Sequence, residues 1–523
     1  MEAEATNPVV ASEDVTDYAE GVRRTLRLLP DVPAERWREL FESGLREALR
    51  QRDLKGLAAV VHLATNLLDA QGRFGDAVAE IDHALAVAGS DADAAALLWS
   101  IRASCLVTQG ATAEALASVD RANEALQGAR SPFARRKALM YGLVARCCSI
   151  AELGFAEVES AIRLLQEEGE DSEVLFLLSW YVPYLYARGH HRRAHPWVRQ
   201  MRIQAELADH RWRQSDATVF EIAEVTCGIA VEPEARTILR PHWLAGWRRT
   251  LLALRQALWR CDWSAAERAL PELALLKTRA GAAQLGEPET FGSLLRAHAS
   301  PTSPVDLPTP DGVHLWNLPS VLAAAEAVAL AGSQSHAAVW LDWFSRTVPT
   351  TIKSALEWPA SVDRIRAMLF LRAGDPRASR HHFELAIRWG GSSGYSVEAA
   401  LAKTQLAEVL AHSAIPVREA IWMSLRREGW AELRGLAIDP FPHAYAASHS
   451  VALARGDVPR PNLSPRECQV LVLLAEGLGY RELADRLGIK EGTVHTLAHR
   501  AFEKLNVRGR FRAVEEARAL GIL

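Results

Sequence analysis

Cysteine is scarce in this sequence, and the few cysteines form no recognisable metal or redox motif. Six cysteines occur among 523 residues, and no two of them stand in a Cys-x-x-Cys spacing. Zinc sites and thiol–disulfide centres commonly use that spacing, so both are disfavoured. We therefore interpret the cysteines as small buried apolar side chains in a reducing compartment. Their positions are 105, 147, 148, 227, 261 and 468.

A long apolar run and a secretory N-terminus are also lacking. No segment reaches the ~18 uninterrupted apolar residues that a membrane span requires. The first residues, MEAEATNPVVASEDV, are acidic, whereas a signal peptide begins with a basic segment and continues with an apolar one. We therefore expect a cytoplasmic protein with no membrane partner.

Motifs for nucleotide, metal or catalytic chemistry are missing as well. The phosphate-cradling pattern G-x-x-x-x-G-K-[ST] does not occur, so we expect no nucleotide hydrolysis. Histidines cluster in RGHHRRAHPW (188–197) and RHHF (380–383), but without cysteines or carboxylates at ligand spacing. We expect both segments at solvent-exposed hairpin turns. No Ser/His/Asp order or carboxylate pair stands out, and the sequence predicts no enzyme, no cofactor and no metal site.

What the sequence has in abundance is helical periodicity. Between about residues 20 and 450, apolar residues recur at three- and four-residue intervals, and Ala, Leu, Glu and Arg are common. This spacing is typical of amphipathic helices, whereas in half-buried strands apolar and polar residues alternate one by one. The chain is also longer than one hydrophobic core usually spans. We predict an all-α fold, in which an array of helical hairpins is followed by a small C-terminal domain.

Two segments of the array match each other, QGRFGDAVAEIDHAL and QGATAEALASVDRANEAL. In each, a glycine is followed by alanines five and twelve residues later, which are Gly72, Ala77 and Ala84 in the first segment and Gly110, Ala115 and Ala122 in the second. Small residues at these offsets let the helices of a hairpin pack closely, and the glycine suits the turn. The pattern resembles the tetratricopeptide repeat, with a spacing of 38 residues instead of ~34. The alternative is an α-helical domain without a regular superhelix.

Three breaks divide the chain. The Pro-rich segment 300–319 cannot continue a helix, GGSSG at 390–394 is predicted to be a turn between hairpins, and 455–462 (RGDVPRPN) is a short linker. We therefore predict a first block of repeats at 1–299, a second block at 320–454 and a separate domain at 463–523.

The C-terminal segment is basic and has its own helix signals. Residues 460–523 contain 11 Lys and Arg against 8 Asp and Glu, while the whole chain carries −4. This excess permits a nucleic-acid partner without requiring one. Ser464 with Glu467 forms a capping box, and Pro465 suits the first helical position. The first helix then ends at Gly477.

The next two predicted helices have the spacing of a helix-turn-helix. A short helix over 480–487 ends at Gly488, and a third helix begins near Glu491. The third helix has two faces. One carries the apolar residues Val494, Leu497, Ala498, Ala501 and Leu505. The other carries His495, Thr496, His499, Arg500 and Glu503. In a helix-turn-helix the exposed face of this helix enters the major groove, so these residues are the candidate readers of bases.

The string LSPRE…VLxLLAEGLxxRELADRLGIKEGTV…EKLNVRGR closely resembles the LuxR-type DNA-binding domain, a four-helix module, over residues 463–523. A helical-repeat region before this domain is similar to the MalT-like regulators, without their ATPase module. The resemblance implies a sequence-specific transcription regulator that binds promoter DNA as a homodimer at an inverted repeat, through a fourth helix at about 512–519. It also implies a protein or small-molecule effector on the repeats. The DNA-binding residues that it implies, together with those on the polar face, are Arg481, Lys490, Thr493, His495, Thr496, His499, Arg500, Arg508 and Arg510.

Some positions depart from the family pattern. His495 and His499 replace stronger donors, so we expect a modest, pH-sensitive affinity. Lys490 replaces the usual serine cap of the third helix and is expected to reach a phosphate instead. Phe511 stands where a polar cap is usual. The alternative interpretation is a scaffold of helical repeats, whose terminal domain no longer binds DNA.

Overall fold

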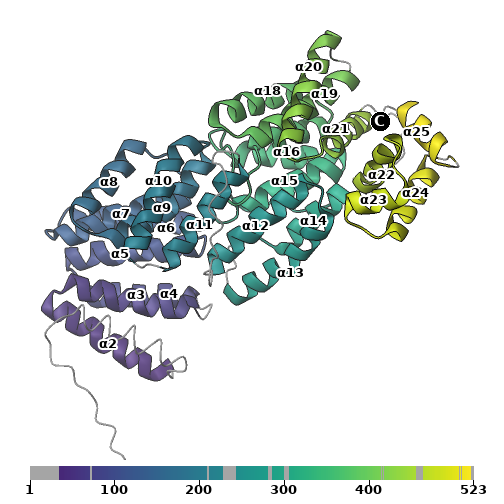
Figure 1. Ribbon diagram of the computed structural model, residues 1–523. Coiled ribbons are helices and arrows are strands. Elements are labelled where there is room, and N and C mark those ends of the chain that lie inside the picture. Colours follow the sequence, from purple (N-terminus) through teal and green to yellow (C-terminus); the bar gives the residue numbers. More distant parts are fainter. Residues whose placement is uncertain are drawn as a thin grey trace, which may run out of the picture. The chain divides into compact units, whose positions relative to one another are not determined.

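Every regular element that the structure describes is a helix (Figure 1). The computed structural model describes residues 34–70, 74–208, 211–227, 243–280, 286–299, 305–413, 415, 417–454, 463–505, 507 and 509–519. No strand occurs in these ranges, so the prediction of an all-α fold is confirmed. None of the described helices combines the length and the apolar character needed to cross a bilayer.

The chain divides into two compact units, residues 1–177 with 280–284, and residues 178–279 with 285–523. In the first unit each helix from α2 to α7 contacts the next helix in sequence, and α3, α5 and α7 also contact one another. The alanines of the two matching segments, Ala77, Ala84, Ala115 and Ala122, are buried in it. Its helices are α2 (Ala34–Gln51), α3 (Leu54–Ala70), α4 (Phe74–Ala88), α5 (Ala92–Thr108), α6 (Thr112–Leu126), α7 (Pro132–Cys148), α8 (Phe155–Glu167) and the start of α9 (Asp171–Ala187).

The second unit holds the rest of the helices, including the C-terminal ones. Helices α22 to α25 follow the other helices of this unit in the chain and are drawn in yellow in Figure 1. Residues 305–317, the described non-helical part of the Pro-rich segment, belong to this unit.

The helices of the second unit after α9 are α10 (His191–Leu207), α11 (Arg211–Thr226), α12 (Trp243–Trp259), α13 (Trp263–Ala280), α14 (Pro288–Ala299), α15 (Leu318–Ala331), α16 (Gln334–Thr347), α17 (Val362–Arg372), α18 (Pro376–Ser393), α19 (Ser396–His412), α20 (Glu419–Gly435), α21 (Phe441–Ala454), α22 (Pro465–Ala475), α23 (Tyr480–Leu487), α24 (Glu491–Lys504) and α25 (Arg510–Ala519).

Four charged side chains meet in the core of the second unit. Arg255, Glu326, Arg364 and Glu398 come from α12, α15, α17 and α19, and each is at most 2% exposed. Each guanidinium lies within 3.1 Å of both carboxylates. Two positive and two negative charges thus neutralise each other where water does not reach them, which is how a folded core tolerates buried charge. We call these residues the buried charge cluster.

The predicted turn at 390–394 is wrong in part, because α18 continues through Gly390 to Ser393 and ends only at Gly394. Gly390 is buried against the start of α19. A Cβ at this position would lie 2.8 Å from the Cβ of Ala399 and 3.0 Å from the carbonyl oxygen of Tyr395. Glycine therefore serves close helix packing here, and only Gly394, with φ of 83°, makes a left-handed turn.

Two adjacent glycines of α18 are expected to respond in opposite directions to alanine. Gly390→Ala would place a methyl group against the backbone at the start of α19, and it should lower the free energy of unfolding by about 1–3 kcal/mol. Gly391 is exposed and a Cβ there meets nothing within 4 Å, so Gly391→Ala should raise it by up to about 1 kcal/mol. Urea unfolding followed by circular dichroism measures both changes. Equal effects of the two substitutions would contradict this account of the packing.

The expectation that the first histidine segment lies at an exposed turn is wrong for His191, which is fully buried. Its ring stacks on Tyr186 with centroids 4.5 Å apart. Trp389 and Tyr395 pack edge-on against the same ring. Burial lowers the pKa of His191 to about 4, so the ring is neutral and acts as a flat core side chain.

Several predicted features lie outside the described residues. These are Gly72 of the first matching segment, residues 300–304 of the Pro-rich segment, the linker 455–462 and Arg508.

Candidate nucleic-acid interface

The first helix of the C-terminal domain begins as its sequence predicts. The Ser464 hydroxyl accepts from the Glu467 N–H at 3.2 Å, and the Glu467 carboxylate accepts from the Ser464 N–H at 2.6 Å. Both bonds satisfy N–H groups that an uncapped helix leaves without partners. The helix ends at Ala475, with Gly477 in a left-handed conformation just after it.

The corner between α23 and α24 is made by Gly488. Its φ of 63° and ψ of 34° are left-handed, a conformation that costs side-chain-bearing residues energy. At the next residue, the Ile489 N–H donates to the Ala484 carbonyl oxygen at 3.0 Å and closes the end of α23. The bounds of α23 and the start of α24 agree with those predicted from the sequence, while α25 starts at Arg510, two residues earlier than predicted.

The apolar face of α24 holds the domain together. Val494, Ala498 and Ala501 are at most 1% exposed, Leu505 is 5% exposed and Leu497 is half-buried. They pack against α22, α23 and α25 in two adjoining clusters. The opposite face therefore has a fixed direction relative to the rest of the domain.

That opposite face is open to solvent, as the helical periodicity predicts. Side chains can contact the bases in a groove of DNA only if the domain itself does not bury them. The five residues that define this face are all exposed, as is Thr493 one turn earlier; they are His495, Thr496, His499, Arg500 and Glu503.

The ring of His495 lies against Tyr480 at the start of α23. The two ring centroids are 4.2 Å apart, with an interplanar angle of 36°. Contacts between rings favour particular relative orientations. The sequence analysis did not identify Tyr480 as a neighbour of the candidate site. The signal is invisible in the sequence, since the two rings are brought together by the turn between helices.

Carboxylates accompany both histidines on this face. His495 Nε2 lies 4.0 Å from Glu491 Oε1, and His499 Nδ1 lies 3.4 Å from Glu503 Oε1. A phosphate would be repelled by these carboxylates. Each of the two histidine rings therefore has a negative charge beside it.

Three of the residues predicted to bind DNA are cations that are open to solvent. Arg481, Lys490 and Arg500 are exposed, and no ion pair to any of them is found in the part of the chain that the structure describes. Lys490 is the N-cap of α24 and makes no capping hydrogen bond, so the first N–H groups of the helix remain available to an anion.

Two other cations are engaged within the domain. Lys504 Nζ lies 2.7 Å from a carboxylate oxygen of the buried Glu467, and Arg510 donates to the carbonyl oxygen of Gly477 at 3.4 Å. Lys504 therefore links α24 to α22. Arg510 uses one guanidinium N–H in its bond to Gly477, and a guanidinium group has further N–H donors.

Residues 461–517 match the model of the family described as bacterial regulatory proteins, luxR family. The matched residues include all of α22, α23 and α24 and most of α25. No curated protein matches the chain. The C-terminal domain is thus a LuxR-type helix-turn-helix domain, which supports a DNA-binding transcription regulator.

Proposed function

We propose that this protein is a sequence-specific transcription regulator that reads promoter DNA through α24 and senses a partner protein or small ligand through its other helices. The observation that carries the proposal is the exposed polar face of α24. This face follows the left-handed Gly488 in a LuxR-type domain whose Arg481, Lys490 and Arg500 are exposed cations. Such an arrangement places a helix in the major groove and cations at the adjoining phosphates.

The residues divide into two roles in this proposal. His495, Thr496 and His499 meet base edges, because they point away from the domain core and none of them carries a permanent positive charge. Arg500 stands beside them on the same face. We assign the phosphate contacts to Arg481, Lys490, Thr493 and Arg510, and also to Arg508, which lies outside the described residues.

We further propose that the protein binds DNA as a homodimer through α25. Ala513 and Ala517 turn inward to the domain core, whereas the Phe511 side chain is 78% exposed. A partner subunit that packed on α25 would remove this apolar side chain from water. A two-fold dimer would read an inverted-repeat site.

The helices before the C-terminal domain are proposed to form a tetratricopeptide-like array that carries the effector, as in MalT-like regulators without the ATPase module. Burial of the repeated alanines and the left-handed Gly110, with φ of 76°, support this proposal. So do the contacts of α3, α5 and α7 with one another, since stacked hairpins bring alternate helices together.

Salt-dependent binding tests the proposed function. The full chain is titrated onto duplex promoter DNA at several salt concentrations, and log K should fall linearly with log salt, with a slope of about −0.9 for each neutralised phosphate. Fluorescence anisotropy of labelled DNA provides the measurement. If the chain does not bind DNA at low salt, or if its affinity does not depend on salt, the result would favour a second candidate, a protein-interaction scaffold that does not bind DNA.

That second candidate is a protein-interaction scaffold with a terminal domain that does not bind DNA. Glu491 and Glu503 favour it, because carboxylates beside both histidines oppose the approach of phosphates. The salt titration separates the two functions.

A further inference from the structure

One face of α22 is buried although it does not belong to the apolar clusters of the C-terminal domain. Pro465 and Gln469 stand one helical turn apart on this face, and both are buried. Arg466, beside Pro465 on the same side of the helix, is half-buried. None of the three is a member of the two clusters that hold the domain together. We call Pro465, Arg466 and Gln469 the docking face.

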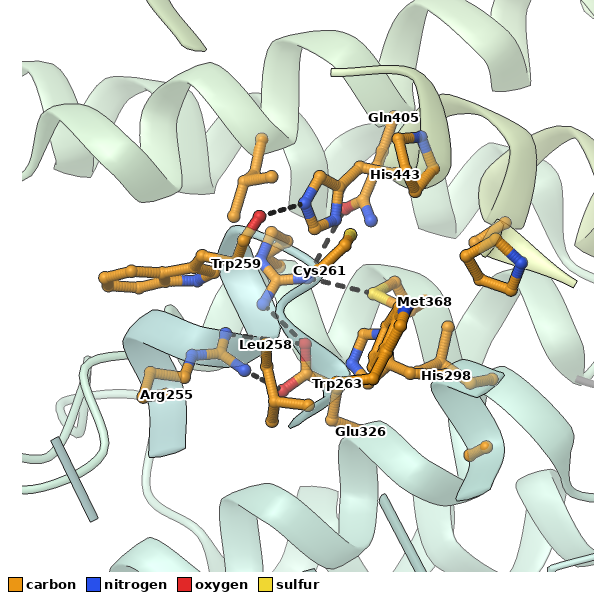
Figure 2. A pocket seen from close by; sticks show the side chains of 17 residues that line it. Arg255, Leu258, Trp259, Cys261, Trp263, His298, Glu326, Met368, Gln405 and His443 are labelled. Atoms are coloured by element: carbon orange, nitrogen blue, oxygen red, sulfur yellow. Dashed lines mark hydrogen bonds and ion pairs between the residues drawn. The ribbon is translucent and has the colours of Figure 1, made fainter. Parts of the chain in front are cut away.

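Helices that precede the domain in the chain lie against the docking face. Helix α22 contacts α14 and α21, which belong to the same unit (Figure 1). Pro465 lines a narrow cavity together with residues of α14, of α21 and of the corner between α12 and α13. Figure 2 shows residues from each of these segments around the cavity, and they are Cys261, Trp263, His298 and His443. The first turn of α22 is therefore packed where these segments meet.

Arg466 brings a positive charge to this contact. Burial lowers the pKa of its guanidinium group, whereas the neighbouring Cys261 and Asp262 act in the opposite direction. Asp262 is exposed and caps α13, since its carboxylate accepts from the Ala265 N–H at 3.0 Å. The two sides of the contact thus carry opposite charges, which favours docking.

The DNA-binding surface of the domain stays open while the docking face is covered. The polar face of α24 is exposed, and so are Arg481 and Lys490. Phe511, in the proposed dimerisation helix α25, is 78% exposed. Docking through α22 and DNA binding through α24 therefore use different surfaces of the domain, so that neither needs to displace the other.

We propose that the domain stays docked on α14 and α21 through the docking face while α24 binds DNA. The other helices of the second unit are then held in a fixed position on the duplex. This inference rests on the proposed function and concerns its regulation. A signal received by those helices would change DNA binding by shifting the docking face, and not by uncovering α24.

Alkylation of Cys261 in the full chain reports docking without DNA. Cys261 lines the cavity with Pro465 and is 2% exposed, and burial raises the pKa of its thiol, so iodoacetamide should modify it slowly. Arg466→Glu places a carboxylate near Asp262, and the repulsion should raise the rate at least about fivefold. Glutamate suits the first turn of a helix, so α22 should still form. Peptide mass spectrometry measures the rate, with the fully buried Cys147 as internal control.

Two further variants separate docking from a general effect of charge. Arg427→Glu reverses an exposed charge on α20 and should leave the rate at Cys261 unchanged. Asp262→Asn combined with Arg466→Glu should restore part of the protection, because asparagine can still cap α13 but carries no repelling charge. An unchanged rate in Arg466→Glu, or an equal increase in Arg427→Glu, overturns the docking face.

The same readout with DNA tests whether the domain stays docked. A saturating duplex, selected for binding from a random library, should leave Cys261 of the unmodified sequence as protected as in the free chain. Faster alkylation on the duplex overturns the proposal. Arg466→Glu should bind this duplex within about twofold of Arg427→Glu, whereas a gain of about tenfold would show that docking masks α24. If the chain binds no duplex at all, the proposed function fails as well, and that result is distinct from binding with Cys261 exposed.

Discussion

Replacing Glu398 by glutamine is expected to lower the free energy of unfolding by about 3–5 kcal/mol, the cost of breaking a buried ion pair from one side. Glu398 is 0% exposed. It accepts from Arg364 Nε at 2.6 Å, from Arg255 Nη2 at 3.1 Å and from the Ser361 N–H at 2.7 Å. The amide keeps the shape of the side chain but removes its charge. Two guanidinium groups are then left with the single carboxylate of Glu326.

Urea unfolding followed by circular dichroism measures this loss, and Glu432→Gln is the matched control. Glu432 also pairs with a cation, Lys403, but its side chain is 41% exposed. Exposed pairs contribute about 0–1 kcal/mol, because water screens them. If the two substitutions lowered the free energy of unfolding by similar amounts, the buried charge cluster would contribute no more to stability than an exposed ion pair.

The buried charge cluster also predicts that the free energy of unfolding decreases in acid. Burial by itself raises the pKa of Glu326, but Arg255 and Arg364 outweigh burial and hold the pKa well below its ordinary value. A lowered pKa in the folded state gives stability that is complete above the unfolded-state pKa, about 4. It is lost as pH falls toward the folded-state pKa. In Glu326→Gln, which has no carboxyl group to titrate at this position, this acid-dependent part of the stability should be absent, and urea unfolding at several pH values measures it.

Replacing Arg481 and Lys490 together by alanine is expected to weaken DNA binding about 10- to 1000-fold at moderate salt. Both side chains are exposed and carry no ion pair in the described residues, so their charge is available to phosphates. Each lost phosphate contact should also reduce the salt slope by about one for every subunit that makes it. Because phosphates are the same in every sequence, the loss should be similar on all duplexes.

His495→Ala is the contrasting control on the same helix. His495 is held against Tyr480 and faces away from the domain core. Its loss should change which duplexes bind best and leave the salt slope unchanged. If Arg481→Ala with Lys490→Ala changed sequence preference while leaving the slope intact, the assignment of phosphate contacts would be wrong.

Local signals in the sequence predicted the C-terminal domain almost to the residue. Ser464 and Glu467 cap α22, Gly488 turns the chain between α23 and α24, and apolar spacing sets the buried face of α24. All of these depend on residues within a few positions of one another. Hydrogen bonds and side-chain spacing along a single helix therefore decide them. Gly390 was predicted from the same local signals to form a turn, and that prediction was wrong. Glycine is required there because a neighbouring helix packs closely against it, which the local sequence does not reveal.

The sequence by itself thus determined that the chain is helical and that it ends in a helix-turn-helix with an exposed polar face. Only the tertiary structure decided which distant residues meet. Arg255, Glu326, Arg364 and Glu398 come from four helices, and their pairing depends on how those helices pack. The same packing places Tyr480 against His495. Periodicity reveals which face of a helix is buried, whereas it contains no information about the partner that buries it.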